Sequence, residues 1–277
     1  AVIGAGFASG REILAYFATF SKGGILGCIT LLVVFTVSVY AILSYSYQKR
    51  VYCYTDLLSS LFRPTFRRMV TFLVTLFLFA SFFVMASGAG ALLHEQFGWH
   101  KSIGILLLIA ISFVVLLFDI KGLARLNLYL TPVLIVGIML ISLHAVFDAT
   151  SPVFAPILKT AVFNPVTSAL IYVSYNMLMS TPVLIPLARF LESRRDAKIS
   201  AALCGVLLFV ATLAVYFAMY FTCLQVLPYD IPILKLASVM GPWAEYLYCA
   251  VMIFALLTSS VAAGYGFVEK LAADLKL

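Results

Sequence analysis

The chain consists of long apolar runs separated by short polar connections. A helix that crosses the hydrocarbon core of a bilayer needs about 20 mostly apolar residues, and about eight runs approach or exceed that length. We predict transmembrane helices over residues 1–20, 23–47, 69–93, 102–118, 124–147, 168–190, 199–225 and 244–268. The runs lack the alternation of apolar and polar positions that is typical of membrane β-barrels. The predicted fold class is therefore an all-α integral membrane protein.

Composition supports this prediction. Of the 277 residues, 64% are hydrophobic and 10% are Asp, Glu, Lys or Arg, and the mean hydropathy is +1.11. Soluble domains are about half apolar and about a quarter charged, so this chain has too little polar surface to cover a soluble core. The net charge of +7 comes from basic residues in short gaps between the runs. The expected partner is thus the lipid bilayer and not nucleic acid.

The basic residues also indicate an orientation. If the connection after the second run is cytoplasmic, 13 Lys and Arg residues lie inside and four lie outside, as the positive-inside rule requires. We therefore expect a multi-pass protein of the cell inner (plasma) membrane with residues 48–68 and 189–198 in the cytoplasm. The connections 148–167 and 226–243 would lie outside and contain short surface helices. Because residue 1 already lies in an apolar run, we expect residues 1–277 to be a single transmembrane domain cut from a longer protein.

The first run carries signals of an interrupted helix. Gly4, Gly6 and Gly10 permit close packing or a non-helical backbone. Ser9 and Glu12 then form the Ser-x-x-Glu pattern of a capping box, which marks a helix start. A helix that starts inside a membrane segment implies a break there, over about residues 4–8. The alternative is a continuous helix in which the glycines form a packing face.

The sixth run carries a second signal. Ser180 and Thr181 precede Pro182, and Ser or Thr followed by Pro is typical of a helix start. We expect a break over roughly residues 176–181. The alternative is a proline kink whose Ser and Thr hydroxyls bond to the previous turn. Interruptions in the first and sixth runs match a five-plus-five inverted repeat, in which two discontinuous helices bind solute and coupling ion near the midplane.

With these motifs, the chain resembles the LeuT-fold amino acid–polyamine–cation superfamily. Its Gly-Ala-Gly-Phe-Ala-Ser-Gly-Arg-Glu segment is most similar to the YkvI-like bacterial membrane proteins. The resemblance implies about eight of ten or more helices, with helices 1 and 6 discontinuous. It also implies a sodium ion held by the carbonyls of Ile3 and Ala255 and the hydroxyls of Thr258 and Ser259. The alternative for these two hydroxyls is bonding within their own helix or to a neighbouring helix.

The expected function is secondary active transport of a small organic solute, an amino acid or related molecule, by sodium symport. Alternating access would occur about a site between helices 1, 3, 6 and 8. The chain is not expected to be an enzyme, and no cofactor besides sodium is expected. We expect the solute to contact backbone or side chains of Gly4, Ala5, Gly6, Phe7, Ala8, Ser9, Ser87, Tyr175, Asn176, Met177, Ser180 and Thr181.

Two charged residues lie within the first run. Arg11 and Glu12 are candidates for gating or coupling, because charges inside a membrane segment are costly and usually functional. For Arg11 the alternative is snorkelling toward the interface, and for Glu12 it is capping alone. Two further functions remain open: a proton-coupled transporter that uses Glu12, and a solute receptor of the same fold that does not transport, as in germinant receptors. The sequence leaves the solute, the direction of transport and the oligomeric state open.

Overall fold

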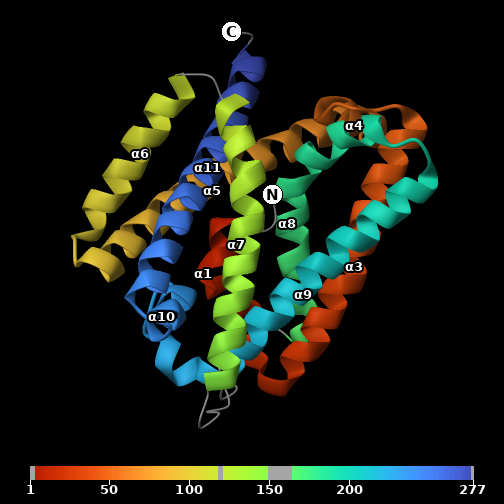
Figure 1. The fold of residues 1–277 in the computed structure, drawn as a ribbon. Helices are drawn as coiled ribbons and strands as arrows, with labels where there is room; N and C mark the ends of the chain where they lie inside the picture. Colours follow the sequence, from red (N-terminus) through yellow and green to blue (C-terminus); the bar gives the residue numbers. More distant parts are fainter. Residues whose placement is uncertain (1–3, 118–120, 149–163, 276–277) are drawn as a thin grey trace. The chain divides into compact units, whose positions relative to one another are not determined.

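The computed structural model describes residues 4–117, 121–148 and 164–275. Every regular element in these ranges is a helix (Figure 1), so the all-helical class is confirmed for the described chain. The elements are α1 (Ala5–Ser9), α2 (Arg11–Tyr16), η1 (Ala18–Gly23), α3 (Gly24–Lys49), α4 (Tyr54–Leu61), α5 (Pro64–Phe97), α6 (Lys101–Leu117), α7 (Lys121–Asp148), α8 (Pro165–Leu187), η2 (Ala188–Phe190), α9 (Arg194–Val226), α10 (Pro232–Val239) and α11 (Pro242–Leu275).

Five segments are long and apolar enough to cross a bilayer. They are Ala18–Lys49, Pro64–Phe97, Thr131–Asp148, Arg194–Thr222 and Pro242–Val268. A sixth span results if the two parts of α8, bent by 56°, are counted as one. The first predicted run is instead divided into short helices, and α6 has 17 residues, about 25 Å of helix against a core of about 30 Å. The described residues therefore support five or six spans, fewer than the eight predicted.

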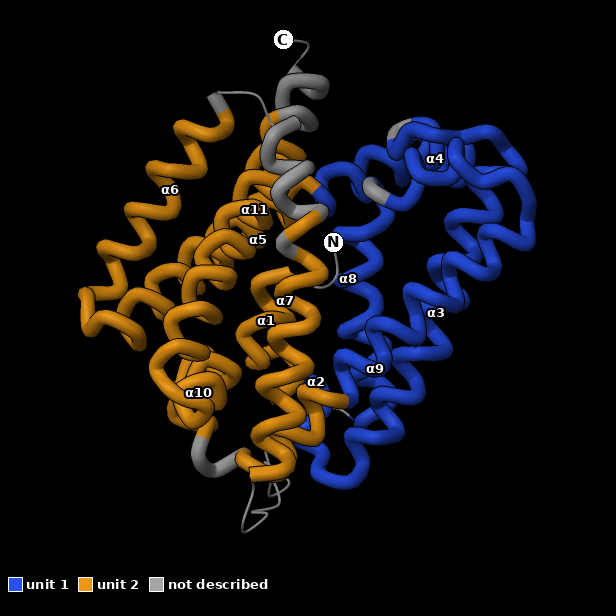
Figure 2. The backbone as a smooth tube through the Cα atoms, in the orientation of Figure 1, with its two compact units in different colours: residues 1–2, 16–74, 156–213 blue, residues 3–15, 75–155, 214–277 orange. Residues whose placement is uncertain are grey.

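The chain divides into two compact units (Figure 2). Unit 1 comprises Ala1–Val2, Tyr16–Val74 and Pro156–Leu213, and unit 2 comprises Ile3–Ala15, Thr75–Ala155 and Ala214–Leu277. The long helices α5 and α9 each begin in unit 1 and continue into unit 2. Each unit is therefore assembled from segments that are far apart in the sequence.

Unit 1 is organised by the packing of α3 along α8. Glycine permits this close approach, because a methyl group on Gly27 would lie 3.3 Å from the Pro165 carbonyl oxygen. Aromatic side chains fill the space where the first run meets α8. The rings of Tyr16 and Phe17 lie 5.5 Å and 5.2 Å from that of Tyr172, which is fully buried. Small and aromatic residues thus complement one another in this core, as in other membrane helix pairs.

Unit 2 is organised around α11, which packs against α6, α7, α10 and α1. The contact with α6 includes a buried hydrogen bond of 2.7 Å between the hydroxyls of Ser112 and Ser260. The contact between α5 and α6 again depends on glycine, because a methyl group on Gly104 would lie 2.7 Å from the Ala89 carbonyl oxygen. The core of unit 2 is therefore held by apolar packing with a few buried polar contacts.

The connection between α9 and α11 differs from the prediction. We expected a short surface helix there, and the structure has the helix α10, but its side chains Ile233, Leu234 and Leu236 are buried. The apolar face of α10 packs against α7, α11 and α1. The helix is part of the core of unit 2, because a helix this apolar is most stable when its face is covered. Most of the other predicted outer connection, 148–167, lies outside the described residues.

Candidate functional site

The first run is interrupted at Gly10. The residue adopts φ +78°, and its N–H donates to the Phe7 carbonyl, which ends α1 before α2 begins at Arg11. A left-handed conformation of this kind is easily accessible only to glycine. Within the segment 4–8, where we expected the break, Gly4 is the extended N-cap of α1 and Ala5–Ala8 are helical, with the Ala8 N–H donating to the Gly4 carbonyl over 2.9 Å. The break therefore lies at the end of the glycine-rich segment.

Ser9 connects the two sides of the break. Its hydroxyl donates to the Gly6 carbonyl over 2.7 Å and accepts from the Arg11 N–H over 3.2 Å. The Ser9 hydroxyl thus bonds to the first N–H of α2, that of Arg11, whereas the capping box predicts a bond to the N–H of Glu12. The half-buried Glu12 side chain lies against Gly6, where an added methyl group would collide with the carboxyl group. The absence of a side chain at Gly6 thus creates the space that Glu12 occupies.

Tyr248 of α11 binds the last turn of α1. Its buried hydroxyl donates to the Ala8 carbonyl over 2.5 Å. A carbonyl at the end of a helix has no partner within that helix, and leaving it unpaired in an apolar core would be costly. Tyr248 therefore satisfies a backbone group that the break releases, and it fixes α1 to α11. The sequence pattern did not single out this residue, because one tyrosine in an apolar run is an ordinary packing residue.

Three charged side chains converge on the segment 227–231, between α9 and α10. The Arg11 guanidinium donates to the carbonyls of Leu227 and Tyr229 over 3.4 Å and 3.0 Å. The Glu95 carboxylate accepts from the backbone N–H groups of Asp230, over 2.5 Å, and Ile231. Arg11 therefore has backbone partners within unit 2, and its predicted role in gating would act through this segment.

Lys101 supplies the third charge. Its ammonium lies 2.5 Å from the Asp230 carboxylate. This hydrogen bond and the negative charge of Asp230 raise the pKa of Lys101. The sequence pattern did not single out Glu95 or Asp230. The signal that could have identified them is that acidic residues are scarce, with 11 in the chain, and that these two lie at the ends of apolar runs.

The polar residues predicted in α8 bond within their own helix. Asn176 donates to the Tyr172 carbonyl, Ser180 to the Asn176 carbonyl and Thr181 to the Met177 carbonyl, over 2.6–2.9 Å. The segment 176–181 is helical, and the bend of 56° follows at Pro182. Proline has no N–H to donate and its ring disturbs the preceding turn. The described geometry therefore matches the kink alternative, with the bend C-terminal to the predicted break.

The expected sodium ligands of α11 lie together, as their spacing requires. The buried Thr258 hydroxyl donates to the Ala255 carbonyl over 3.2 Å, so the two oxygens share one face of the helix. Thr258 retains acceptor capacity toward a cation, since a hydroxyl that donates one bond still has lone pairs. Ser259 is half-buried. Ile3 lies outside the described residues, so the structure leaves the helix-1 side of the expected ion site undescribed.

The remaining expected solute contacts are distributed over both units. Ala5, Phe7 and Ala8 are buried in unit 2, where α1 packs against α10 and α11. Ser87 of α5 is exposed in unit 2, although its neighbour Ala86 is buried. Tyr175 and Met177 belong to unit 1, in which the Tyr175 ring lies 5.4 Å from that of Tyr172.

Comparisons with known proteins identify two relatives in Bacillus subtilis (strain 168). The chain is 28% identical over 265 residues to the uncharacterized membrane protein YkvI, a match that covers 96% of this chain and 76% of the relative. It is 24% identical over 279 residues to the uncharacterized protein YyaD, covering 100% of this chain and 80% of the relative. No family model matches the chain, and no solved structure matches it. The similarity to a membrane protein agrees with the long apolar helices of this chain, and together they indicate a membrane protein.

Proposed function

We propose that this chain forms the core of a secondary transporter for a small organic solute, with the five-plus-five architecture of the LeuT-like superfamily. The observation that carries the proposal is which helices belong to each of the two compact units. Unit 1 contains α3, α8 and the first part of α9, and unit 2 contains α5 from Thr75, α6, α7 and α11. Unit 1 thus holds predicted runs 2 and 6 with the first part of run 7, and unit 2 holds runs 4, 5 and 8 with most of run 3 and the rest of run 7.

That division shares run 2, run 6 and part of run 7 with the bundle that alternating access would move in the proposed architecture, whereas Ile3–Ala15 of the first run lies in unit 2. A bundle of helices 1, 2, 6 and 7 would move against the remaining helices about a site near the midplane. The first run belongs to both units, with Ile3–Ala15 in unit 2 and Tyr16 onward in unit 1. The break at Gly10 lies close to the boundary at Ala15 and Tyr16, whereas the Pro182 bend lies within unit 1. The interruption of the first run therefore supports a moving bundle.

Sodium is the proposed coupling ion. The donor set on α11 fits it, because Na⁺ is a hard cation that prefers neutral oxygen ligands, and Ala255 and Thr258 present a carbonyl and a hydroxyl on one buried face. Ser259 would add a second hydroxyl, and Ile3 would add a carbonyl from the first run. Coupling through a proton on Glu12 is the competing mechanism, supported by the half-buried position of that carboxyl group against Gly6.

Transport by the full-length protein reconstituted in liposomes tests the proposal. A panel of labelled amino acids and related solutes is offered with an inward sodium gradient, with an inward proton gradient, and with neither. Accumulation that requires sodium supports symport, and accumulation that requires the proton gradient assigns coupling to protons. Solute binding without accumulation under any gradient would contradict transport and indicate a receptor of the same fold.

A further inference from the structure

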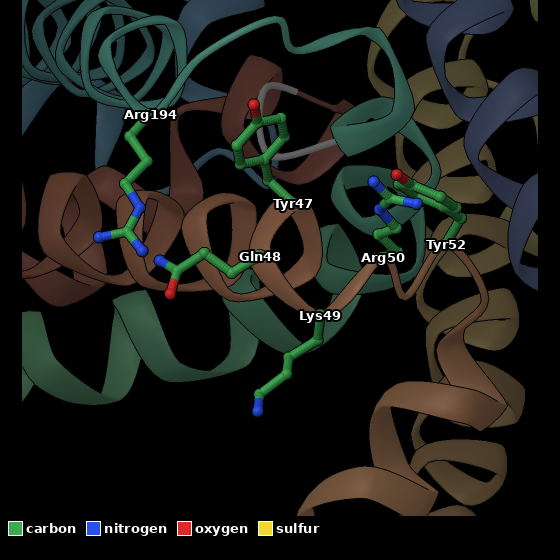
Figure 3. Close-up of a pocket in the computed structure, with 6 residues that line it drawn as sticks. All are labelled: Tyr47, Gln48, Lys49, Arg50, Tyr52 and Arg194. Carbon is green, nitrogen blue, oxygen red and sulfur yellow. The ribbon is translucent and has the colours of Figure 1, made fainter.

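Unit 1 contains a polar pocket that the proposed transport site does not use. It is an open pocket of about 790 Å³ lined by Tyr47, Gln48, Lys49, Arg50, Tyr52 and Arg194. Figure 3 shows the side chains of Arg194 and Gln48 extending toward one another, with Arg50 beside Tyr52. The pocket is thus lined by the end of α3, the connection that follows it and the first residue of α9.

The pocket is strongly cationic. Lys49, Arg50 and Arg194 each carry a positive charge, and its lining includes no carboxylate. Within the part of the chain that the structure describes, the single salt bridge is that of Lys101, so none of these three cations has an acidic partner within 4 Å. The Asp196 carboxylate, which does not line the pocket, accepts from the backbone N–H groups of Glu192 and Ser193 at the start of α9.

The backbone at Arg50 points to a role for its side chain. Arg50 ends α3 with φ +53°, and the N–H groups of Arg50 and Val51 both donate to the Ser46 carbonyl. This is the arrangement in which glycine is the usual residue. Arginine adopts the left-handed conformation less readily, and backbone strain that persists in a fold is often linked to function. The backbone conformation at residue 50 would favour glycine, so the presence of arginine there indicates that its guanidinium group binds a ligand.

Two neutral side chains are held in place around the cations. The Tyr47 hydroxyl donates to the Glu192 carbonyl over 2.8 Å, which connects the end of α3 to the segment before α9. The Gln48 amide donates to the Ser44 hydroxyl over 2.8 Å. These bonds limit the motion of the two side chains, so part of the pocket lining is already ordered before a ligand binds.

The place of the pocket in the fold indicates the ligand class. Ala18–Lys49 is a candidate span, so the pocket lies where a span ends, at the level of lipid headgroups. One guanidinium group can donate two parallel hydrogen bonds to phosphate oxygens. Tyrosines are enriched at this level of a bilayer. We propose that the pocket binds a phosphate group, which comes from the headgroup of an anionic phospholipid or from a soluble phosphate. This site is independent of the transport site proposed above.

Binding of lipid to the purified full-length protein in detergent tests this site. Native mass spectrometry would count bound phosphatidylglycerol, with phosphatidylcholine, which is zwitterionic and has no net charge, as the comparison. Arg194→Gln should weaken phosphatidylglycerol binding about fivefold, since one basic residue near a membrane surface contributes about 1 kcal/mol. Arg195→Gln is the matched control, because Arg195 is the next residue of α9, is exposed, and does not line the pocket.

Arg50→Gly separates binding from folding. Glycine suits the left-handed backbone, so this variant should be at least as stable to heat as the wild type while losing affinity about fivefold. Displacement of phosphatidylglycerol by millimolar inorganic phosphate would assign the site to a soluble phosphate, and resistance to it would assign the site to lipid. Equal phosphatidylglycerol binding by the wild type, Arg194→Gln and Arg50→Gly, with no response to inorganic phosphate, would overturn the proposal.

Discussion

The hydroxyl of Tyr248 donates a hydrogen bond of 2.5 Å to the carbonyl oxygen of Ala8. The two residues are 240 positions apart, yet the bond lies at the last turn of α1, directly before Gly10 breaks the helix. An interruption in an apolar core releases backbone groups that need partners, and this tyrosine provides one. The relationship explains how a broken helix can be stable inside unit 2.

Removing that hydroxyl should destabilise the protein. Tyr248→Phe retains the ring but leaves the Ala8 carbonyl without its donor, a loss of about 1–3 kcal/mol. Thermal unfolding in detergent should show a lower midpoint for this variant. Tyr246→Phe is the control on the same helix, since the Tyr246 side chain is 58% exposed. Equal midpoints for the two variants would show that the bond to Ala8 contributes nothing measurable.

Gly10 should tolerate no side chain. Gly10→Ala introduces a left-handed alanine, at a cost of about 1–2 kcal/mol, and its methyl group would lie 2.7 Å from Ile233 Cγ1. Overpacking typically adds about 1–3 kcal/mol. Gly98 also has a positive φ, +68°, but no atom lies within 4 Å of the same methyl position. Gly98→Ala therefore measures the backbone cost alone. If Gly10→Ala lowers the free energy of unfolding no more than Gly98→Ala does, the described packing of α10 on the break is contradicted.

The proposed sodium site predicts a dependence of solute binding on two hydroxyls. Thr258→Val and Ser259→Ala should each raise the sodium concentration for half-maximal binding about tenfold, because each deletes one oxygen ligand worth about 1–3 kcal/mol. Thr222→Val is a suitable control, since the Thr222 hydroxyl is buried in unit 2 and donates to its own helix at the Ala218 carbonyl. Binding that does not respond to sodium in the wild type would exclude the site.

Ser260 is no neutral control for that experiment. The sequence suggests that Ser260, one position beyond Ser259, should matter little, but its hydroxyl bonds to Ser112 in the contact between α6 and α11. Ser112→Ala and Ser260→Ala should each lower the unfolding midpoint in detergent. The double variant should lose less than the sum of the two, with a coupling of about 0.6–2 kcal/mol. Strict additivity of the two losses would indicate that the hydroxyls do not interact.

The segment 227–231 should depend on Glu95. Glu95→Gln replaces the charged acceptor of the Asp230 and Ile231 N–H groups with a neutral one, so hydrogen exchange of these two amides should accelerate about tenfold. His94→Gln alters the preceding residue, whose ring bonds to the Trp99 carbonyl instead. It should leave the exchange of both amides unchanged.

The Lys101 ion pair gives the same segment a pH dependence. Because the folded state raises the pKa of Lys101, the pair stabilises the segment at neutral pH, and this contribution is lost as the pH rises through the raised pKa, above about 10.4. Lys101→Met should remove this alkaline transition from the unfolding curve while leaving the rest of the curve in place. An unchanged transition in the variant would assign it to another group.

The sequence by itself determined the elements that depend on local pattern. Long apolar runs without the alternation of a β-barrel can bury their backbone in a bilayer only as helices, so the helical class and the membrane environment follow from composition and spacing. Gly4–Gly10 and the Ser9–Glu12 pattern likewise predicted an interruption, because glycine and a capping serine act on their own backbone. The resemblance to YkvI-like proteins also rested on this segment.

Tertiary structure decided where the chain departs from those patterns. The break lies at Gly10 because Ile233 and Met219 leave no space for a side chain there, and because Ser9 and Tyr248 satisfy the released backbone groups. The hydroxyls of Ser180 and Thr181 donate to carbonyls of the preceding turn of α8, so the helix bends at Pro182 and is not interrupted before it. The burial of α10 and the gathering of Arg11, Glu95 and Lys101 on one segment depend on contacts between residues up to 218 positions apart. Local propensity contains no information on such pairs, because their stability arises only when distant helices pack together.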